Sequence, residues 1–248
     1  MKDRGCNSGS ARLLSDAQID AVCADIAAYY AGRIACFGAH PLGVDWSCKA
    51  TQSLRFAQLL KVCPSEGPLS LIDLGCGYGA LATFLAARRG HGEVDYLGLD
   101  VASEMVRRGR RRHRGNDKVR FAVGRSSPQT ADYVVASGIM NVKLGIGRPT
   151  WEGFVRTMLL DMHRMARRGF AVNFLTRPGR QSMPGQLYCT TPAKWVRFCE
   201  RELDCSVEIL DDYGMDHGMH EFTLLARTPN AASASRRIDH VASGMVAR

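Results

Sequence analysis

A strand, a glycine-rich turn and a helix follow one another between Leu69 and Arg89, and this stretch constrains the fold more than any other. The strand is expected to be a short, buried apolar run that ends at Leu74. The turn that follows, Gly75 to Gly79, has the sequence GCGYG. Glycine suits such a turn because it adopts positive φ and leaves room for a ligand where a Cβ would stand. This order is typical of α/β proteins that bind a nucleotide-like ligand at the carboxyl ends of their strands.

The glycine spacing alone fits two kinds of ligand, because Gly75, Gly77 and Ala80 also satisfy the dinucleotide pattern. Asp100, which ends the next expected strand, can bind the ribose hydroxyls of either ligand. Asp73 separates the two possibilities. A carboxylate just before the first glycine would repel a pyrophosphate, whereas it would attract the ammonium and sulfonium groups of S-adenosylmethionine (AdoMet). We therefore expect AdoMet, and the less favoured alternative is a tight turn without a ligand, in which Asp73 caps the helix.

Beyond the turn, expected strands and helices alternate along the chain. The strands are expected at residues 69–74, 94–100, 118–123, 131–136, 170–175, 205–210 and 220–227. The helices are expected at residues 15–37, 47–62, 78–89, 102–114, 150–167 and 192–202, and the first should be capped by Ser15 or Asp16. This alternation indicates a parallel sheet with helices on both faces.

Three motifs in these segments resemble the class I AdoMet-dependent methyltransferases, namely IDLGCGYGAL (72–81), YLGLDVASEM (96–105) and ADYVVASGIMN (131–141). The chain is similar in particular to a bacterial subgroup with four further motifs, which stand here at residues 43–46 (GVDW), 173–176, 187–189 and 221–223 (EFT). The resemblance extends from about Tyr29 to Arg227. It implies an α/β fold with a Rossmann-like, doubly wound, seven-stranded sheet. That sheet would be mostly parallel with an antiparallel C-terminal strand, and helices of an N-terminal lid would cover the cofactor.

Four regions are expected along the chain. Residues 1–14 are polar and are expected to be disordered, and residues 15–66 to form the helical lid. Residues 67–227 would form the Rossmann-like methyltransferase domain. Residues 228–248 are rich in Ala and Ser without periodicity, which predicts a flexible tail.

The cofactor site is expected at the turn, at the second strand, after the fourth strand and on the lid. The expected cofactor-binding residues are Arg55, Asp73, Gly75, Cys76, Gly77, Gly79, Asp100, Val101, Met105 and Ser137. Arg55 would pair with the AdoMet carboxylate, and a surface salt bridge is the equally weighted alternative. The chain departs from the family after the third strand, where an acid that often contacts adenine is replaced by Gly124 and Arg125.

The acceptor is expected where the fourth and fifth strands end, and the catalytic candidates are Asn141, Tyr188 and His220. Asn141 would bind the acceptor or the methionine moiety, and capping of its own loop is an equally weighted alternative. His220 is a candidate general base, although a surface role is the more common one for such a histidine. It stands three residues after His217, but no third ligand is nearby in the sequence, so no metal site is expected.

The net charge and the cysteine content limit which partners and which compartment are expected. The chain carries a net charge of +9, of which nine basic residues and one acid between Arg107 and Arg125 supply +8. Such a patch could attract RNA, but it is poor in aromatic residues, and a solvated helix end is favoured. No apolar run is long enough to span a membrane. The nine scattered cysteines include no CxxC pair, which favours free thiols in the cytoplasm.

These observations predict a cytoplasmic AdoMet-dependent methyltransferase that acts on a small molecule in a biosynthetic pathway. Two alternatives stay open. The first is an RNA methyltransferase that uses the basic patch, and the second is a regulatory protein that binds AdoMet without catalysis.

Overall fold

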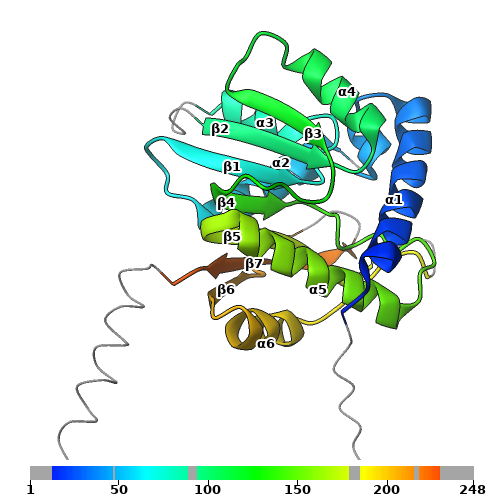
Figure 1. Cartoon of the computed structure of the whole chain (residues 1–248), viewed down its shortest axis with the longest axis vertical. Coiled ribbons are helices and arrows are strands. Elements are labelled where there is room, and N and C mark those ends of the chain that lie inside the picture. The colour runs from blue at the N-terminus through cyan, green and yellow to red at the C-terminus, as the bar shows by residue number, and fades with distance from the viewer. Residues whose placement is uncertain (1–12, 47, 89–93, 179–184, 215–217, 230–248) are drawn as a thin grey trace, which may run out of the picture.

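A single mixed sheet forms the centre of the computed structural model, which describes residues 13–46, 48–88, 94–178, 185–214 and 218–229 (Figure 1). Within these residues the strand order is β3-β2-β1-β4-β5-β7-β6. The strands are β1 (Leu69–Leu74), β2 (Val94–Asp100), β3 (Val119–Val123), β4 (Ala131–Ala136), β5 (Ala166–Arg177), β6 (Ser206–Leu210) and β7 (His220–Arg227). The first five are parallel, and β7 is antiparallel to both β5 and β6. The expected fold class is therefore confirmed.

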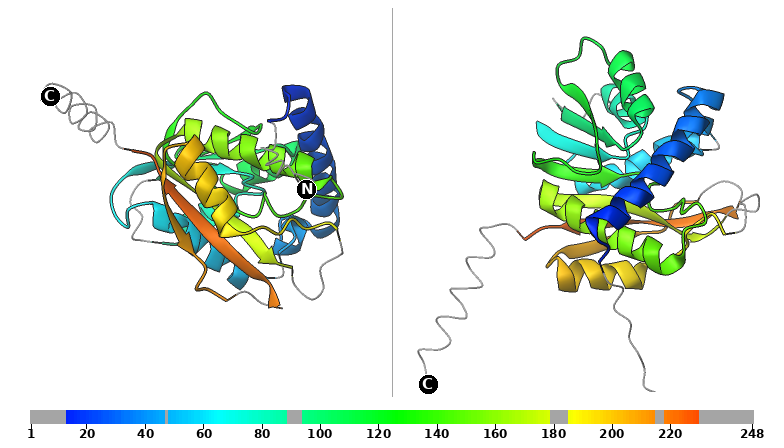
Figure 2. Two further views of the ribbon diagram at one scale, coloured as in Figure 1. Left: turned by 90° about the horizontal axis from the view of Figure 1, so that it is seen from below. Right: turned by 45° about the vertical axis from the view of Figure 1, so that its right-hand side comes forward.

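Helices cover both faces of the sheet, as Figure 2 shows. They are α1 (Asp16–Phe37), α2 (Lys49–Leu59), α3 (Ala80–Ala86), α4 (Ser103–Arg112), α5 (Arg148–Met165) and α6 (Pro192–Glu202), with short 3₁₀ helices at Pro41–Val44 and Leu60–Val62. Neighbouring residues of a strand pack against different helical layers, because side chains alternate between the two faces of a strand. Val134 packs in the cluster that α5 and α6 complete, whereas Val135 packs in the cluster of α2 and α3.

Helix α1 crosses the carboxyl ends of the strands and joins the two sides of the molecule (Figure 1). Ser15 caps it in a reciprocal capping box with Gln18, as the sequence predicts. Near its start, Ile19 belongs to the apolar cluster of α5. Near its end, Ile34 packs with Met105 of α4. The helix therefore forms one wall of the space above the strand ends.

The bounds of α1 to α5, β3, β5 and β6 differ from the expected ranges, and β5 begins already at Ala166, within the range expected for the preceding helix. Two of the differences have a direct physical reason. The helix after the glycine turn begins at Ala80 rather than at Tyr78, because Gly79 at its N-terminus has φ +81°. Strand β5 extends to Arg177, beyond the expected end at Leu175, because it continues to pair with β7. Most of the expected disordered N-terminus and flexible tail, and residues 89–93 of the chain, lie outside the described residues.

Candidate active site

The glycine turn is held against the end of β2 by its backbone. The N–H groups of Gly75 and Cys76 both donate to the carbonyl of Leu99, at 2.8 and 3.0 Å. Gly75 has φ +74°, and a Cβ built on it would lie 2.1 Å from Cγ2 of Ile139. No other residue fits this position without displacing the loop after β4. Gly75 therefore lets the turn and the loop after β4 approach each other closely at the space above the strands.

Asp100 connects this turn to the start of α4. Its Oδ2 accepts the N–H of Gly77 and its Oδ1 accepts the N–H of Ala102, both at 2.8 Å. The side chain thereby fixes the turn that leads into α4, whose N-cap residue Ala102 receives no side-chain capping bond. Burial raises the pKa of Asp100 to about 6, although the two backbone N–H groups act in the opposite direction.

A second buried carboxyl group lies beside the turn, at Asp73. The hydroxyl of Tyr96 donates to its Oδ2 at 2.6 Å. Burial raises the pKa of Asp73 to about 7, the Tyr96 hydrogen bond lowers it, and the charge of Asp100 raises it further. The site therefore concentrates two acidic groups whose ionisation a cationic ligand would favour.

A cavity of about 520 Å³ opens above these groups. Its walls come from α1, the 3₁₀ helix at Pro41–Val44, α2, α5, the ends of β1 and β2, and the loop after β4. Ser137, directly after β4, also contributes to the wall, and its buried Oγ has no hydrogen-bond partner among the described residues. A volume of this size is typical of a small-molecule site.

Arg55 of α2 lines the cavity, but its guanidinium is engaged by the protein itself. Its Nε donates to Oε2 of Glu221 on β7 at 2.5 Å, and its guanidinium carbon lies 4.0 Å above the ring of Trp46. Asn173 of β5 completes the contact, since its Nδ2 donates to Glu221 at 3.4 Å and its Oδ1 accepts the N–H of Gly138 at 2.8 Å. Arg55 therefore fixes the lid to the sheet, and its expected contact with the AdoMet carboxylate stays a prediction.

The lid also carries a polar cluster that the sequence analysis did not identify. Asp45 has φ +58° and pairs with Arg33 of α1 at 2.8 Å. The hydroxyls of Tyr29 and Tyr30 also hydrogen-bond to Asp45, and all four residues line the cavity. The sequence feature that could have indicated this cluster is the GVDW motif, because Asp45 is its acidic residue.

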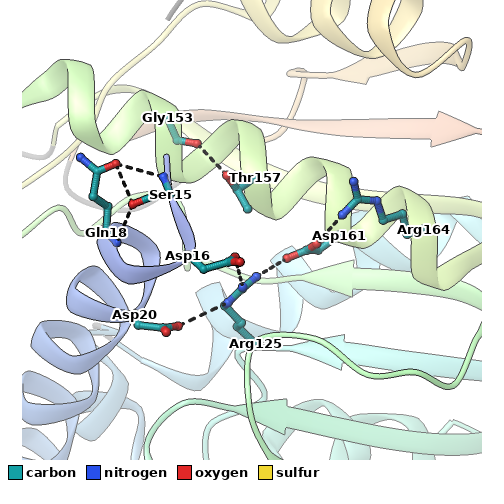
Figure 3. A network of polar contacts seen from close by, with 9 residues as sticks. All are labelled: Ser15, Asp16, Gln18, Asp20, Arg125, Gly153, Thr157, Asp161 and Arg164. Atoms are coloured by element: carbon teal, nitrogen blue, oxygen red, sulfur yellow. Dashed lines mark hydrogen bonds and ion pairs between the residues drawn. The ribbon is translucent and has the colours of Figure 1, made fainter. Parts of the chain in front are cut away.

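Arg125 holds three elements together beside the cavity (Figure 3). Its guanidinium contacts Asp161 of α5 at 2.7 Å, Asp16 of α1 at 3.3 Å and Asp20 of α1 at 4.0 Å. Asp161 is also 3.5 Å from Arg164. The residue that replaces the family's adenine-contacting acid is thus a structural link between α1 and α5.

The three catalytic candidates do not meet at the cavity. Asn141 lines it, and its Oδ1 accepts the N–H of Leu175 at 3.1 Å, so the loop-capping role is present. Tyr188 is buried outside the lining, with its hydroxyl donating to Glu152 at 3.1 Å, and burial raises its pKa to about 12. His220 is exposed at the start of β7, and its Nε2 lies 3.1 Å from Arg177.

Most of the expected cofactor residues do meet there. The lining includes Arg55, Asp73, Gly75, Cys76, Gly77, Asp100, Val101, Met105 and Ser137. Gly79 lies outside it, at the start of α3, where a Cβ would be 2.7 Å from Phe121. Among the described residues no group of His, Cys, Asp and Glu side chains could hold a metal ion. His217 lies outside the described residues.

Comparison with known proteins identifies relatives of this chain. Residues 72–159 match a family described as a methyltransferase domain. The chain is 38% identical over 169 residues to the "Putative methyltransferase Rv1506c" of Mycobacterium tuberculosis, an alignment that covers 68% of this chain and 98% of that protein.

Solved structures with the same fold include two methyltransferases. The magnesium protoporphyrin IX methyltransferase ChlM of Synechocystis, solved with bound S-adenosylhomocysteine (SAH), has a TM-score of 0.60 at 14% identity and covers 86% of this chain and 100% of its own. The N-methyltransferase NodS of Bradyrhizobium japonicum, also solved with SAH, has a TM-score of 0.54 at 16% identity and covers 73% and 88%. The chain therefore belongs to the class I AdoMet-dependent methyltransferases, the family that its motifs resemble.

Proposed function

We propose that the cavity binds AdoMet against the glycine turn and that the enzyme methylates a small molecule held beside it. The observation that carries this proposal is the placement of Asp73 and Asp100 beside the glycine-rich turn, in the lining of a cavity of about 520 Å³. Acidic groups there favour a ligand that carries ammonium and sulfonium charges. The same groups would disfavour the pyrophosphate of a dinucleotide.

The residues present fit AdoMet on two further observations. A Cβ at Gly75 would collide with Ile139, so glycine lets the loop after β4 close against the turn, and both contribute to the cavity wall that would face the ligand. The buried Oγ of Ser137 has no partner among the described residues, and a polar ligand atom would supply one. We assign the ribose hydroxyls to the free lone pairs of Asp100 and the adenine to the surroundings of Val101 and Met105, which line the same end.

The protein contributes to methyl transfer chiefly by holding the two reactants in position and by enclosing them. AdoMet supplies a methyl group on a sulfonium, and its transfer forms one bond to the acceptor atom while the carbon–sulfur electron pair returns to sulfur. Helix α1 and the Arg55–Glu221 contact keep the walls closed, which excludes water and fixes the two reactants relative to each other. Asn141, whose oxygen is fixed by Leu175, keeps a steady position at the acceptor end.

A small molecule is a better acceptor than RNA because of where the basic residues point. Arg107 and Arg108 contact Glu104, Arg110 donates to the carbonyl of Phe121, and Arg120 contacts Asp95. Each guanidinium is thus engaged locally, which weakens the electrostatic case for a phosphate backbone. The name of ChlM likewise specifies a small-molecule substrate, magnesium protoporphyrin IX.

We propose that the enzyme works in the cytoplasm within a biosynthetic pathway. The cysteines that the structure describes are all free thiols, in agreement with a reducing compartment. Within the described residues, none of the helices combines the length and the apolar character of a membrane span.

Calorimetric titration with AdoMet and, separately, with NAD tests the proposal. We expect micromolar AdoMet binding and no heat with NAD. The Asp100→Ala variant should bind AdoMet at least about tenfold more weakly, since hydrogen bonds to a charged group are lost. Asp95→Ala is the matched control, because Asp95 lies on the same strand but is exposed and outside the cavity. NAD binding, or AdoMet binding that Asp100→Ala leaves unchanged, would refute the proposed site. AdoMet binding without turnover of any acceptor would support the regulatory alternative.

A further inference from the structure

The cavity extends beyond the glycine turn into an apolar part between α1, α5 and the loop after β4. Cys23 and Ile26 of α1 and Ile139 of the loop pack against the cluster that contains Phe154 and Met158 of α5, and all five line the cavity. Further apolar lining comes from Val142, Leu175 and Leu187. An acceptor held beside the methyl donor would therefore contact mainly hydrocarbon and sulfur.

The arginines that line the cavity are each paired with a carboxylate. Arg33 faces Asp45, Arg55 faces Glu221 and Arg125 faces Asp161. The side chains of Arg55 and Glu221 are 8% and 0% exposed, so this guanidinium has little access to a second anion. Among the described lining residues, none of the arginines is left for a phosphate or a carboxylate of the acceptor.

The acidic lining residues are committed in the same way. Asp45 is bound by Arg33 and two tyrosine hydroxyls, and Asp73 and Asp100 lie at the glycine turn, where the methyl donor is placed. A cationic acceptor would therefore find no unpaired carboxylate among the described residues of the apolar part. A charge that enters such a space without a partner loses its hydration and gains nothing in return.

Two uncharged polar groups remain at this end. The Oδ1 of Asn141 is used by the N–H of Leu175, whereas its Nδ2 donates to no described residue. Gln186 lines the same cavity, and its carbonyl accepts the N–H of Lys143. Its side chain has no hydrogen bond to a described residue. An amide N–H that is held in place and unpaired is a donor for an oxygen of the ligand.

We propose that the acceptor is an uncharged, largely apolar molecule whose hydroxyl or carbonyl oxygen accepts a hydrogen bond from Asn141. This rests on the proposed function and narrows its substrate class. Phosphorylated, carboxylated and cationic acceptors are excluded by the paired charges of the lining, and the amide selects among apolar molecules those that carry an oxygen.

The test uses four probes with one carbon frame and different charges. They are para-hydroxybiphenyl, para-biphenylcarboxylate, the ammonium form of para-aminomethylbiphenyl and biphenyl itself. Their binding to the full chain is measured by calorimetry in the presence of saturating SAH. We expect the hydroxyl probe to bind at least about tenfold more tightly than either charged probe. Biphenyl should bind more weakly than the hydroxyl probe by the contribution of one hydrogen bond, about fivefold.

The Asn141→Asp variant isolates the amide nitrogen, because it keeps an oxygen for the N–H of Leu175. Because a hydroxyl can donate to the new carboxylate, the lost donor is measured with a fifth probe, para-acetylbiphenyl, whose oxygen only accepts. The variant should weaken this probe at least about fivefold, leave biphenyl within about twofold and improve the ammonium probe relative to the carboxylate. Asn116→Asp is the matched control, since the Oδ1 of Asn116 likewise accepts a backbone N–H, from Lys118, at 3.1 Å on an exposed turn. Gln186→Leu tests the second amide at a partly exposed position that should tolerate substitution.

Equal or tighter binding of either charged probe would overturn the proposal. So would the absence of probe binding by a protein that binds SAH, or unchanged binding of para-acetylbiphenyl in both Asn141→Asp and Gln186→Leu. Failure to bind SAH or AdoMet at all would instead refute the proposed function. The two failures are distinguishable because cofactor binding is measured first and the probes are also titrated without it.

Discussion

Arg55 and Glu221 are 166 residues apart in the sequence, yet the Nε of the first lies 2.5 Å from Oε2 of the second in the buried interior. One belongs to the lid helix α2 and the other to the last strand, β7. The face of the guanidinium lies 4.0 Å from the ring of Trp46. This contact closes the cavity by joining two segments that the rest of the domain separates.

Removing Arg55 should therefore cost stability rather than only cofactor affinity. Arg55→Leu leaves the Glu221 carboxylate buried without a positive charge beside it and with the Asn173 amide at 3.4 Å, and we expect the free energy of unfolding to fall by about 3–5 kcal/mol. The double variant with Glu221→Leu should recover most of that loss. Urea denaturation of the single and double variants measures both. If Arg55→Leu left stability unchanged but lowered AdoMet affinity tenfold or more, Arg55 would contact the cofactor directly.

Gly75→Ala should damage the turn more than a comparable change elsewhere. Its Cβ would lie 2.1 Å from Ile139, whereas Gly115, with φ +85°, has nothing within 4 Å. Both substitutions incur the cost of positive φ, about 1–2 kcal/mol. Only Gly75→Ala adds overpacking, about 1–3 kcal/mol more. Thermal or urea unfolding of the two variants, with AdoMet titration of each, checks the difference. Equal losses would show that the loop after β4 yields freely.

The raised pKa of Asp73 predicts that the free energy of unfolding falls as the pH rises. Its pKa in the folded protein is about 7, above its ordinary value of 3.8, so between these pH values the folded chain retains a proton that the unfolded chain has lost. Its contribution is therefore fully present below about pH 4 and is lost as the pH rises toward 7, by up to roughly 1.4 kcal/mol per pH unit. Asp73→Asn removes this dependence and should be more stable than the wild type at pH 8. The test is the difference in unfolding free energy between the two proteins from pH 4 to pH 8, and a flat or rising difference in favour of the wild type would contradict it.

Of the three ion pairs of Arg125, only the one with Asp161 of α5 should contribute measurably to stability, whereas the pairs with Asp16 and Asp20 of α1 should contribute little. Asp161 is 10% exposed, whereas Asp16 and Asp20 are 90% and 74% exposed. Arg125→Leu leaves Asp161 with Arg164 alone, and we expect a loss of about 1–2 kcal/mol. Asp16→Asn, the matched control, should change stability by less than about 0.5 kcal/mol, because exposed ion pairs contribute little. Urea denaturation measures the free energy of unfolding of each variant. Limited proteolysis within α1 measures how accessible that helix becomes. Equal losses from both variants would mean that the exposed pair matters as much as the buried one.

The sequence predicted those parts of the fold that local signals determine. The bounds of β1, β2, β4, α6 and β7 coincide with the expected ranges, because each is an apolar run or an amphipathic stretch with clear punctuation. The glycine turn and Asp100 were predicted for the same reason, since strand, turn and acid follow in a fixed local order. The Ser15 cap is a further example.

Contacts between distant segments could not be predicted from those signals. Nothing near Arg55 in the sequence indicates Glu221, and nothing near Tyr188 indicates Glu152, to which its hydroxyl donates. Arg125 stood out as a departure from the family, but its three carboxylates come from two other helices. Such pairings depend on how helices cross the strand ends, which periodicity does not specify.

The position of β7 between β5 and β6 has a consequence for the order of assembly. Strand β6 pairs with β7 within the sheet, and Glu221, the anchor of the lid, stands near the start of β7. A nascent chain on the ribosome can form β1 to β5 early, but its lid has no anchor until the last strand has been synthesised and inserted. The cofactor cavity is therefore completed late in synthesis. A chain that ends before Glu221 contains the whole glycine motif, but its cofactor cavity is not closed by the Arg55–Glu221 contact.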